Sequence, residues 1–329
     1  MRAAVIGAGS WGTTVASLLA PRTETLLWAR RPELAERINA GANPDYLDGL
    51  ALPGELSATS ELHDAVRGAD VVIMSVPSHG YRAVLEAAAP DIGVGTPILS
   101  LAKGIEQGTL MRMTEVTADV LSDHAVETIG VLTGPNLARE IMAGQPAATV
   151  IAMADHDTAV ELQTLFMGPQ LRVYTNADVV GAEIAGATKN VMAIAAGMAE
   201  GLGFGLNTVS MLMTRALVEM ARLGIALGGE TATFAGLAGM GDLIATCMST
   251  LSRNHRVGVG LGRGKAIEEI TAEMNMVAEG IKSTRGVLEL AHRASVEMPI
   301  AEQVGRVLYE DASVPEAVSL LMGRPPKRE

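Results

Sequence analysis

Cysteine is almost absent from this chain of 329 residues, in which Cys247 is the single example. One cysteine cannot form an internal disulfide, nor can it supply a multi-cysteine zinc site or an iron–sulfur cluster. Nothing near it in the sequence would acidify its thiol, which favours packing over nucleophilic chemistry. The six histidines show no metal-ligand spacing with a carboxylate, so we expect no metal. A reducing cytoplasm is the compartment that this composition favours.

Long apolar runs are also missing. Lys189, Glu200 and Arg215 interrupt the best candidates, which fall short of the roughly 18 residues that a membrane span needs. The N-terminal run that ends near Ala20 imitates a secretory signal peptide, but its glycines and Trp11 make a poor hydrophobic region. We therefore expect no stable membrane insertion.

Positive charge is in short supply, with 25 lysines and arginines against 37 aspartates and glutamates and a net charge of −12. This balance argues against sequence-independent binding to nucleic acid or to an anionic membrane. The 36 glycines and 14 prolines are too few for a low-complexity chain, and 48% of the residues are hydrophobic. The length predicts about two domains with well-buried cores.

The first half of the chain, to about residue 174, alternates short β-branched apolar runs with longer helical stretches. This alternation is typical of a parallel sheet covered by helices on both faces. The expected strands are Ala3–Ile6, Thr25–Trp28, Val71–Ser75, Pro97–Leu101, Ile129–Leu132, Thr149–Met153 and Arg172–Tyr174. Three of them lead into the loops Val76-Pro77-Ser78-His79, Lys103-Gly104 and Thr133-Gly134-Pro135-Asn136, which should share the ligand-binding edge of the sheet.

After about residue 180 only helical periods remain. We therefore expect an α/β chain: a Rossmann-type, doubly wound dinucleotide-binding domain at residues 1–180, followed by an all-α substrate and catalytic domain at residues 181–329. The helix expected at Glu183–Met198 is apolar almost all round and carries Lys189 at its middle. The next helix should begin at an Asn207 cap and end at Gly224, and a break is expected at Gly239-Met240-Gly241. The remaining helices are expected at Thr231–Ala238, Leu243–Met248, Arg253–Leu261, Ile267–Met274, Lys282–Ala294, Ala301–Glu310 and Pro315–Leu321.

The turn Gly7-Ala8-Gly9-Ser10-Trp11-Gly12 has the G-x-G-x-x-G spacing, after the first expected strand and before a helix-forming run. Its glycines permit a tight turn, close approach of a pyrophosphate, and packing of helix on strand. This context predicts a dinucleotide site. An acidic residue at the end of the second strand would hold the ribose 2′-hydroxyl of NAD, but Arg30 and Arg31 stand there instead. Because two guanidinium groups suit a 2′-phosphate, NADP is favoured over NAD.

Lys189 is the most informative single residue. Loss of hydration in an apolar helix would lower the pKa of its ammonium group and suit it to proton transfer. An ammonium that reaches the helix edge, or that pairs with a carboxylate such as Asp242, is an equally good interpretation. Lys103 lies at the ligand edge of the sheet, where it could meet a phosphate, carboxylate or ketone oxygen. The start of a helix at Ser252-Arg253-Asn254 offers a guanidinium and an amide to a phosphate.

Taken together, these motifs resemble those of the soluble, bacterial-type NAD(P)-dependent glycerol-3-phosphate dehydrogenases. They cover nearly the whole chain in the order and spacing of that family, which makes the set specific although the glycine turn alone is not. The matching segments are Val5-Ile6-Gly7-Ala8-Gly9-Ser10-Trp11-Gly12-Thr13, Val76-Pro77-Ser78, Ala102-Lys103-Gly104, Gly134-Pro135, Lys189-Asn190-Val191, Gly239-Met240-Gly241-Asp242-Leu243, Ser252-Arg253-Asn254 and Val277-Ala278-Glu279-Gly280.

The resemblance implies reduction of dihydroxyacetone phosphate to sn-glycerol 3-phosphate, the head-group precursor of phospholipids, with NAD(P)H as hydride donor. Lys189 matches the family's catalytic lysine, which also contacts substrate, and Lys103 matches the lysine that contacts both substrate and cofactor. The other implied substrate contacts are Gly134, Asn136, Asp242, Ser252, Arg253 and Asn254. The other implied cofactor contacts are Gly7, Gly9, Ser10, Trp11, Gly12, Arg30, Arg31, Ala138, Arg253, Val277 and Glu279. Asn136 departs from the Ser or Thr that is usual in the family, so we expect altered substrate affinity.

Two other functions stay open from the residues alone. A related Rossmann-plus-helical reductase would act on a 2-keto acid, and its substrate would be a carboxylate. A non-catalytic NADP(H)-sensing protein would keep the glycine turn but would not need Lys189 or Ser252-Arg253-Asn254. The expected partners are a small phosphorylated ketone or alcohol and a second copy of the chain in a homodimer, with no nucleic acid.

Overall fold

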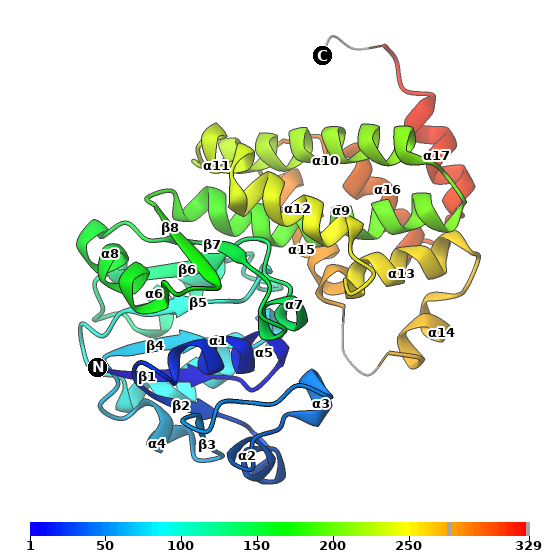
Figure 1. The fold of residues 1–329 in the computed structure, drawn as a ribbon. Coiled ribbons are helices and arrows are strands. Elements are labelled where there is room, and N and C mark those ends of the chain that lie inside the picture. Colours follow the sequence, from blue (N-terminus) through cyan, green and yellow to red (C-terminus); the bar gives the residue numbers. More distant parts are fainter. Residues whose placement is uncertain (275–277, 327–329) are drawn as a thin grey trace.

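The computed structural model describes residues 1–274 and 278–326 as a sheet half and a helical half (Figure 1). The sheet half confirms the expected α/β class. Its strands, in the described residues, have the order β3-β2-β1-β4-β5-β6-β7-β8. Their bounds are β1 (Arg2–Ile6), β2 (Glu24–Trp28), β3 (Ser57–Thr59), β4 (Val71–Met74), β5 (Ile98–Ser100), β6 (Ile129–Thr133), β7 (Ala147–Ala152) and β8 (Leu171–Asn176).

Helices cover both faces of this sheet, as its apolar strands require. All four residues of β4 are fully buried, which explains why its sequence is a continuous apolar run. One face packs against α1 (Ser10–Leu19), α2 (Pro32–Asn39) and α8 (His156–Phe166). The other packs against α4 (Leu62–Val66), α5 (Ser78–Ala88) and α6 (Met113–Val120). The ends of β1, β4, β5 and β6 are thereby left for binding loops.

Two features of the sheet differ from the sequence prediction. Strand β7 runs antiparallel to β6, whereas a parallel sheet was expected. The connection between them holds only the short helix α7 (Ala138–Met142), so the chain turns back beside β6 instead of crossing over the sheet. The three-residue edge strand β3 was not predicted, because so short a segment carries no readable alternation.

The helical half is built around α9 (Val179–Gly201), which passes through its core. This helix is long and apolar enough to cross a membrane, but 89% of its apolar window is buried inside the protein, as in a core helix. Around it pack α10 (Leu206–Ala226), α12 (Asp242–Met248), α13 (Arg253–Gly262), α15 (Glu279–Arg293) and α16 (Pro299–Tyr309). The other helices are α11 (Thr231–Ala235), α14 (Ile267–Ala272) and α17 (Val314–Met322).

Glycines bring α9 and α13 into backbone contact. A Cβ atom added to Gly197 would lie 2.1 Å from the carbonyl oxygen of His255, and one added to Gly258 would lie 2.0 Å from that of Ile194. Only glycine permits so close a crossing. The close crossing sets the start of α13 beside the middle of α9, where Lys189 lies.

The predicted ends of α10 are wrong. Gly205 precedes the helix and Asn207 is inside it, and the helix continues through Gly224. The ring of Phe234 occupies the space where a Cβ of Gly224 would lie, at 2.0 Å, so this glycine serves packing and does not end the helix. The predicted break at Gly239-Met240-Gly241 is also wrong, because these residues belong to a π-helical turn, Leu237–Gly241, that leads into α12.

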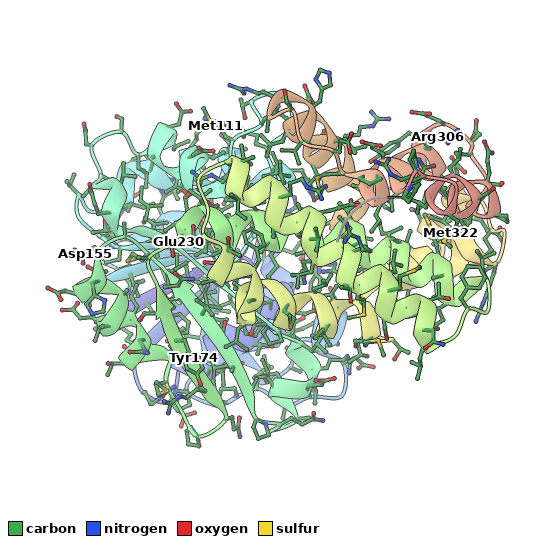
Figure 2. All side chains as sticks on the ribbon, turned by 90° about the horizontal axis from the view of Figure 1, so that it is seen from above. Met111, Asp155, Tyr174, Glu230, Arg306 and Met322 are labelled. Atoms are coloured by element: carbon green, nitrogen blue, oxygen red, sulfur yellow. The ribbon has the colours of Figure 1, made fainter. Side chains whose placement is uncertain are left out.

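The side-chain view shows how far the two halves extend. Seen from above, Asp155 at the start of α8 and Met322 at the end of α17 lie on opposite sides of the molecule (Figure 2). Glu230, just before α11, lies where the halves meet, and its backbone N–H donates to the Asp178 carboxylate over 2.8 Å. The connection from β8 to α9 is therefore tied to the α10–α11 connection.

Candidate active site

The glycine-rich turn between β1 and α1 has the form that a dinucleotide requires. Gly7 has a positive φ of 118°, and a Cβ added there would lie 2.6 Å from the carbonyl oxygen of Ser75. A Cβ on Gly12 would lie 2.0 Å from the carbonyl oxygen of Gly7. By contrast, a Cβ on Gly9 would meet no described atom within 4 Å, and no side chain of the described residues caps the first turn of α1. The backbone N–H groups of α1 are thus open to an anion, and the site fits a pyrophosphate.

Residues around this turn complete the site for a cofactor. The indole Nε1 of Trp11 is buried without a hydrogen-bond partner among the described residues. Ser10 Oγ donates to the carbonyl oxygen of Tyr46 over 3.2 Å. Asn43, which is fully buried, donates to the Ala8 carbonyl oxygen over 3.1 Å. The segment that follows α2 is therefore fastened to the outside of the turn.

Two lysines and one aspartate form the centre of the candidate active site. Lys189 Nζ, at the middle of α9, donates to Asp242 Oδ1 over 2.9 Å and to Thr246 Oγ1 over 2.6 Å. Lys103 Nζ, from the loop after β5, donates to Asp242 Oδ2 over 2.6 Å and to the Gly134 carbonyl oxygen over 3.1 Å. Since an ammonium group has three N–H donors, each lysine keeps one that no described residue accepts.

Burial and charge oppose each other in this group. Burial lowers the pKa of Lys103 to about 8, the negative charge of Asp242 raises it, and the neighbouring Lys189 lowers it. Burial disfavours the charged form of Asp242, but the two ammonium groups together hold the pKa of that carboxyl below its usual range. Asp242 is therefore ionised at neutral pH, and its single charge is shared by two cations. The group as a whole attracts an anion.

The loop after β6 borders this group. Gly134 adopts a positive φ of 140°, which only glycine adopts freely, and so turns its carbonyl oxygen to Lys103. Asn136 Nδ2 donates to Thr149 Oγ1 over 3.0 Å, while Asn136 Oδ1 is buried without a partner among the described residues. The loop whose Gly134 carbonyl oxygen binds Lys103 thus also holds a buried acceptor that no described residue satisfies. Thr149, a hydroxyl residue in a buried apolar strand, was not predicted as part of the site.

A ladder of amide side chains connects the lysine group to the start of α13. Asn190 Nδ2 donates to the Lys103 carbonyl oxygen over 3.2 Å, and Asn254 Nδ2 donates to Asn190 Oδ1 over 2.9 Å. Asn254 Oδ1 in turn accepts the Gly280 backbone N–H over 2.9 Å. Ser252 caps α13 by accepting the N–H of His255 over 3.3 Å. The ladder fixes the first turn of α13 relative to Lys103.

Arg253 and Glu279 stand beside this ladder. The Arg253 side chain is exposed at the first position of α13, and Glu279 opens α15. Burial raises the pKa of Glu279, whereas Arg253, the Ser78 backbone N–H and the two lysines lower it. The Ser78 N–H belongs to the first turn of α5, so Glu279 connects the sheet half to the helical half. Val277 lies outside the described residues.

The predicted cofactor residues at the far end of the sheet lie apart from the lysine group. Arg30 and Arg31 follow β2, which is three strand spacings, or about 14 Å, from β5. Both are exposed, and Arg31 forms an ion pair with Asp45. Ala138 is the first residue of α7, after the Gly134 loop. The basic residues therefore form two sets, one at each end of the binding edge.

Cys247 takes no part in this arrangement. Its side chain is buried in the helical core, and burial raises the pKa of its thiol to about 12. A thiol with so high a pKa is not a nucleophile at neutral pH. The packing role predicted from the sequence fits this environment.

A glycine-rich turn, a Rossmann-type sheet and a lysine pair between the two halves define a dinucleotide-dependent dehydrogenase. Comparison with known families supports this class and identifies one family within it. The N-terminal model of NAD-dependent glycerol-3-phosphate dehydrogenase matches residues 2–159, and the C-terminal model matches residues 178–319. The chain belongs to the NAD-dependent glycerol-3-phosphate dehydrogenase family.

Individual relatives support this assignment. The chain is 54% identical over 305 residues to glycerol-3-phosphate dehydrogenase (NAD(P)+) 2 of Sphingopyxis alaskensis, covering 92% of this chain and 91% of the relative. It is 49% identical to the Thermobifida fusca enzyme of the same activity, over 100% and 98% of the two chains. The crystal structure of the Coxiella burnetii glycerol-3-phosphate dehydrogenase superposes with a TM-score of 0.93, at 36% identity, over 98% and 99% of the chains.

The reductases that act on 2-keto acids, considered above as an alternative, share only their fold with this chain. A 2-dehydropantoate 2-reductase of Geobacter metallireducens superposes with a TM-score of 0.60 at 15% identity, covering 95% of this chain and all of the other. So low an identity carries no information on substrate. The relatives that match at about half identity are glycerol-3-phosphate dehydrogenases.

Proposed function

We propose that this protein reduces dihydroxyacetone phosphate to sn-glycerol 3-phosphate with NADPH or NADH, and so supplies the head group of glycerophospholipids. The observation that carries the proposal is the pair of ammonium groups that share Asp242 and each retain one free N–H donor. A ketone oxygen that becomes an alkoxide needs one such donor, and a phosphate needs positive charge nearby.

Lys189 is the proton donor in this proposal. Its Nζ lies between Asp242 Oδ1 and Thr246 Oγ1, which fix its position from two sides. Thr246 Oγ1 donates its own proton to the Asp242 carbonyl oxygen over 2.6 Å, so it accepts from the lysine. The remaining N–H of Lys189 is directed by these two bonds. It protonates the ketone oxygen in reduction, and the neutral amine accepts the proton in oxidation.

Lys103 and the first turn of α13 bind the rest of the substrate. Lys103 carries its third N–H at the edge where the strands end, and Asn136 lies in the loop whose Gly134 carbonyl oxygen accepts from Lys103. Arg253 and the backbone N–H groups of α13 provide charge and donors for a phosphate group. The substrate contacts are thus Lys103, Gly134, Asn136, Lys189, Asp242, Ser252, Arg253 and Asn254.

The turn Gly7–Gly12 would hold the cofactor pyrophosphate in this proposal, and Arg30, two residues after β2, would bind an adenosine 2′-phosphate. When bound, the nicotinamide ring supplies the hydride that reaches the ketone carbon. The other residues of the proposed cofactor site are Ser10, Trp11, Arg31, Lys103, Ala138, Arg253, Val277 and Glu279.

Three further points belong to the proposal. The dinucleotide-binding domain comprises residues 1–180 and the substrate and catalytic domain residues 181–329, which agrees with the start of α9 at Val179. The protein acts in the cytoplasm, where phosphorylated metabolites and reduced cofactor occur together. It forms a homodimer, for which Leu206, Met211 and Ile225 offer exposed apolar surface along α10.

The proposed function is tested by turnover. We expect the purified protein to oxidise NADPH and NADH when dihydroxyacetone phosphate is added, and to show no comparable rate with 2-keto acids such as pyruvate or ketopantoate. The oxidation is followed by the loss of nicotinamide absorbance. A faster rate with a 2-keto acid would contradict the proposal, and cofactor binding without turnover of any of these ketones would favour a sensing protein.

Replacing Arg253 with alanine should raise the KM for dihydroxyacetone phosphate by about 10- to 100-fold, because a charge-assisted contact to phosphate is lost. Initial rates at saturating cofactor measure this change. Arg256 lies on the same helix and is exposed, so Arg256→Ala is the matched control and should leave KM within about twofold of the original value. An unchanged KM for the Arg253 variant would place the phosphate elsewhere.

A further inference from the structure

Cofactor preference is expected to depend on the residues that follow β2. Arg30 and Arg31 both stand there, which favours NADP if both guanidinium groups are available to a 2′-phosphate. In the structure the Arg31 guanidinium is in an ion pair with Asp45, whose other carboxylate oxygen lies 3.4 Å from Arg37 Nη1. The Asp45 carboxylate thus lies between Arg31 and Arg37.

The position of Asp45 is set by the cofactor site itself. Asp45 lies in the short helix α3 (Pro44–Leu47). On one side of it, the buried Asn43 donates to Thr13 Oγ1 over 2.8 Å and to the Ala8 carbonyl oxygen. On the other side, Tyr46 accepts a hydrogen bond from Ser10. The residues before and after Asp45 are therefore both bound to the glycine-rich turn and α1.

We infer that Asp45 is a specificity-determining residue that weakens the binding of NADP relative to NAD. The inference rests on the proposed function, since it assigns a role at the same cofactor site. Asp45 keeps the Arg31 guanidinium from the adenosine 2′-phosphate, and its own negative charge repels that group. Arg30 has no ion pair among the described residues, so it is the arginine that remains for the phosphate. A 2′-hydroxyl carries no charge and is little affected.

The variant Asp45→Asn tests this inference. It removes the charge with little change in shape and releases Arg31. We expect the Kd of NADPH to fall by about three- to tenfold at low salt and that of NADH to stay within about twofold. The Kd values come from titration of nicotinamide fluorescence without substrate, so the readout does not depend on turnover. Because exposed charges are screened, the gain for NADPH should shrink at about 0.5 M salt.

Asp48→Asn is the matched control. Asp48 is exposed three residues further along the chain, and its carboxylate forms no ion pair among the described residues. Its replacement changes the net charge by the same amount and should leave the ratio of the two Kd values unchanged. The double variant Asp45→Asn with Arg31→Gln should not bind NADPH more tightly than the original protein, because it lacks the Arg31 guanidinium that would contact the phosphate. Far-ultraviolet circular dichroism verifies that each variant is folded.

Several outcomes would overturn the inference. If Asp45→Asn lowered the Kd of both cofactors equally, or if Asp48→Asn lowered the Kd of NADPH as much, the effect would come from the net charge of the protein alone. An unchanged Kd for NADPH would show that Asp45 does not limit its binding. A weaker NADH complex without a gain for NADPH would make Asp45 a ribose ligand instead. Failure of the original protein to bind either cofactor would contradict the proposed function, so the two failures are distinguishable.

Discussion

Lys189→Ala should lower kcat for dihydroxyacetone phosphate reduction by about a thousandfold or more. The expected loss is that of a positioned proton donor in a site where no other described residue holds a proton in the same place. Binding of NADPH should stay within about twofold of the original value, because Lys189 binds Asp242 and Thr246, whereas the glycine-rich turn is held by Asn43 and lies between β1 and α1. Steady-state rates and a fluorescence titration measure the two quantities separately.

The matched control for this prediction is Lys265→Ala. Lys265 lies between α13 and α14, where its ammonium group pairs with Glu273 on the surface. Loss of an exposed ion pair changes little, so kcat should be unaffected. If Lys189→Ala retained substantial turnover while Lys265→Ala behaved as expected, Lys189 would not be the proton donor.

Asp242→Asn should produce the second large effect, on stability and activity together. Asp242 is 2% exposed and is the only carboxylate that a hydrogen bond joins to both lysines among the described residues. An asparagine would leave the two ammonium groups without the carboxylate that bonds both of them, at a cost of about 3–5 kcal/mol in the free energy of unfolding. Denaturant unfolding measures this cost, and kcat should fall as the lysines lose their fixed positions.

The cost of Asp242→Asn should depend on pH in a defined direction. Asp242 raises the pKa of Lys103, so its removal lowers that pKa below its value of about 8 in the original protein. At pH 6, below the pKa of about 8 that Lys103 has in the original protein, the loss of the Asp242 charge should destabilise the protein most. At pH 9 Lys103 is neutral, and the difference from the original protein should be smaller. Equal destabilisation at both pH values would show that Asp242 does not stabilise the protein by balancing the charge of the lysines.

A surface carboxylate supplies the control for this experiment. Asp119 is half exposed and pairs with Arg82 near the end of α6. Asp119→Asn should change the free energy of unfolding by less than about 1 kcal/mol at either pH. A loss for Asp242→Asn no greater than that for Asp119→Asn would show that the two lysines do not depend on Asp242.

The elements of the fold were predictable where burial leaves a strong pattern. The run Val71–Met74 and the apolar helix around Lys189 are both buried on all sides, and their sequences show it. The prediction failed where a glycine has a tertiary role. Gly224 resembles a helix stop, but its function depends on Phe234, ten residues later along the chain. No local pattern contains that information.

The residues of the candidate site were proposed from the sequence, but the hydrogen bonds that connect them could not be predicted from it. The alternatives weighed for Lys189, a pairing with Asp242 or a role in chemistry, prove compatible, since the pairing present in the structure is what orients the amine. Asn190 and Thr149 were not singled out because their roles depend on partners from other elements. Asp45 was missed for the same reason, since only the docking of Asn43 brings it to Arg31.

The central position of α9 has a consequence for how the enzyme fails. Helices α10, α12, α13, α15 and α16 pack around α9, and the glycines at the α9–α13 crossing bring these two backbones into direct contact. Lys189 keeps its neighbours until these helices separate. Heating should therefore abolish proton transfer by Lys189 only when the helical half unfolds. The α3 segment with Asp45 lies outside this helical core, and the hydrogen bonds of Asn43 and Ser10 hold it on the glycine-rich turn and α1. Loss of cofactor discrimination should therefore precede loss of catalysis as the temperature rises.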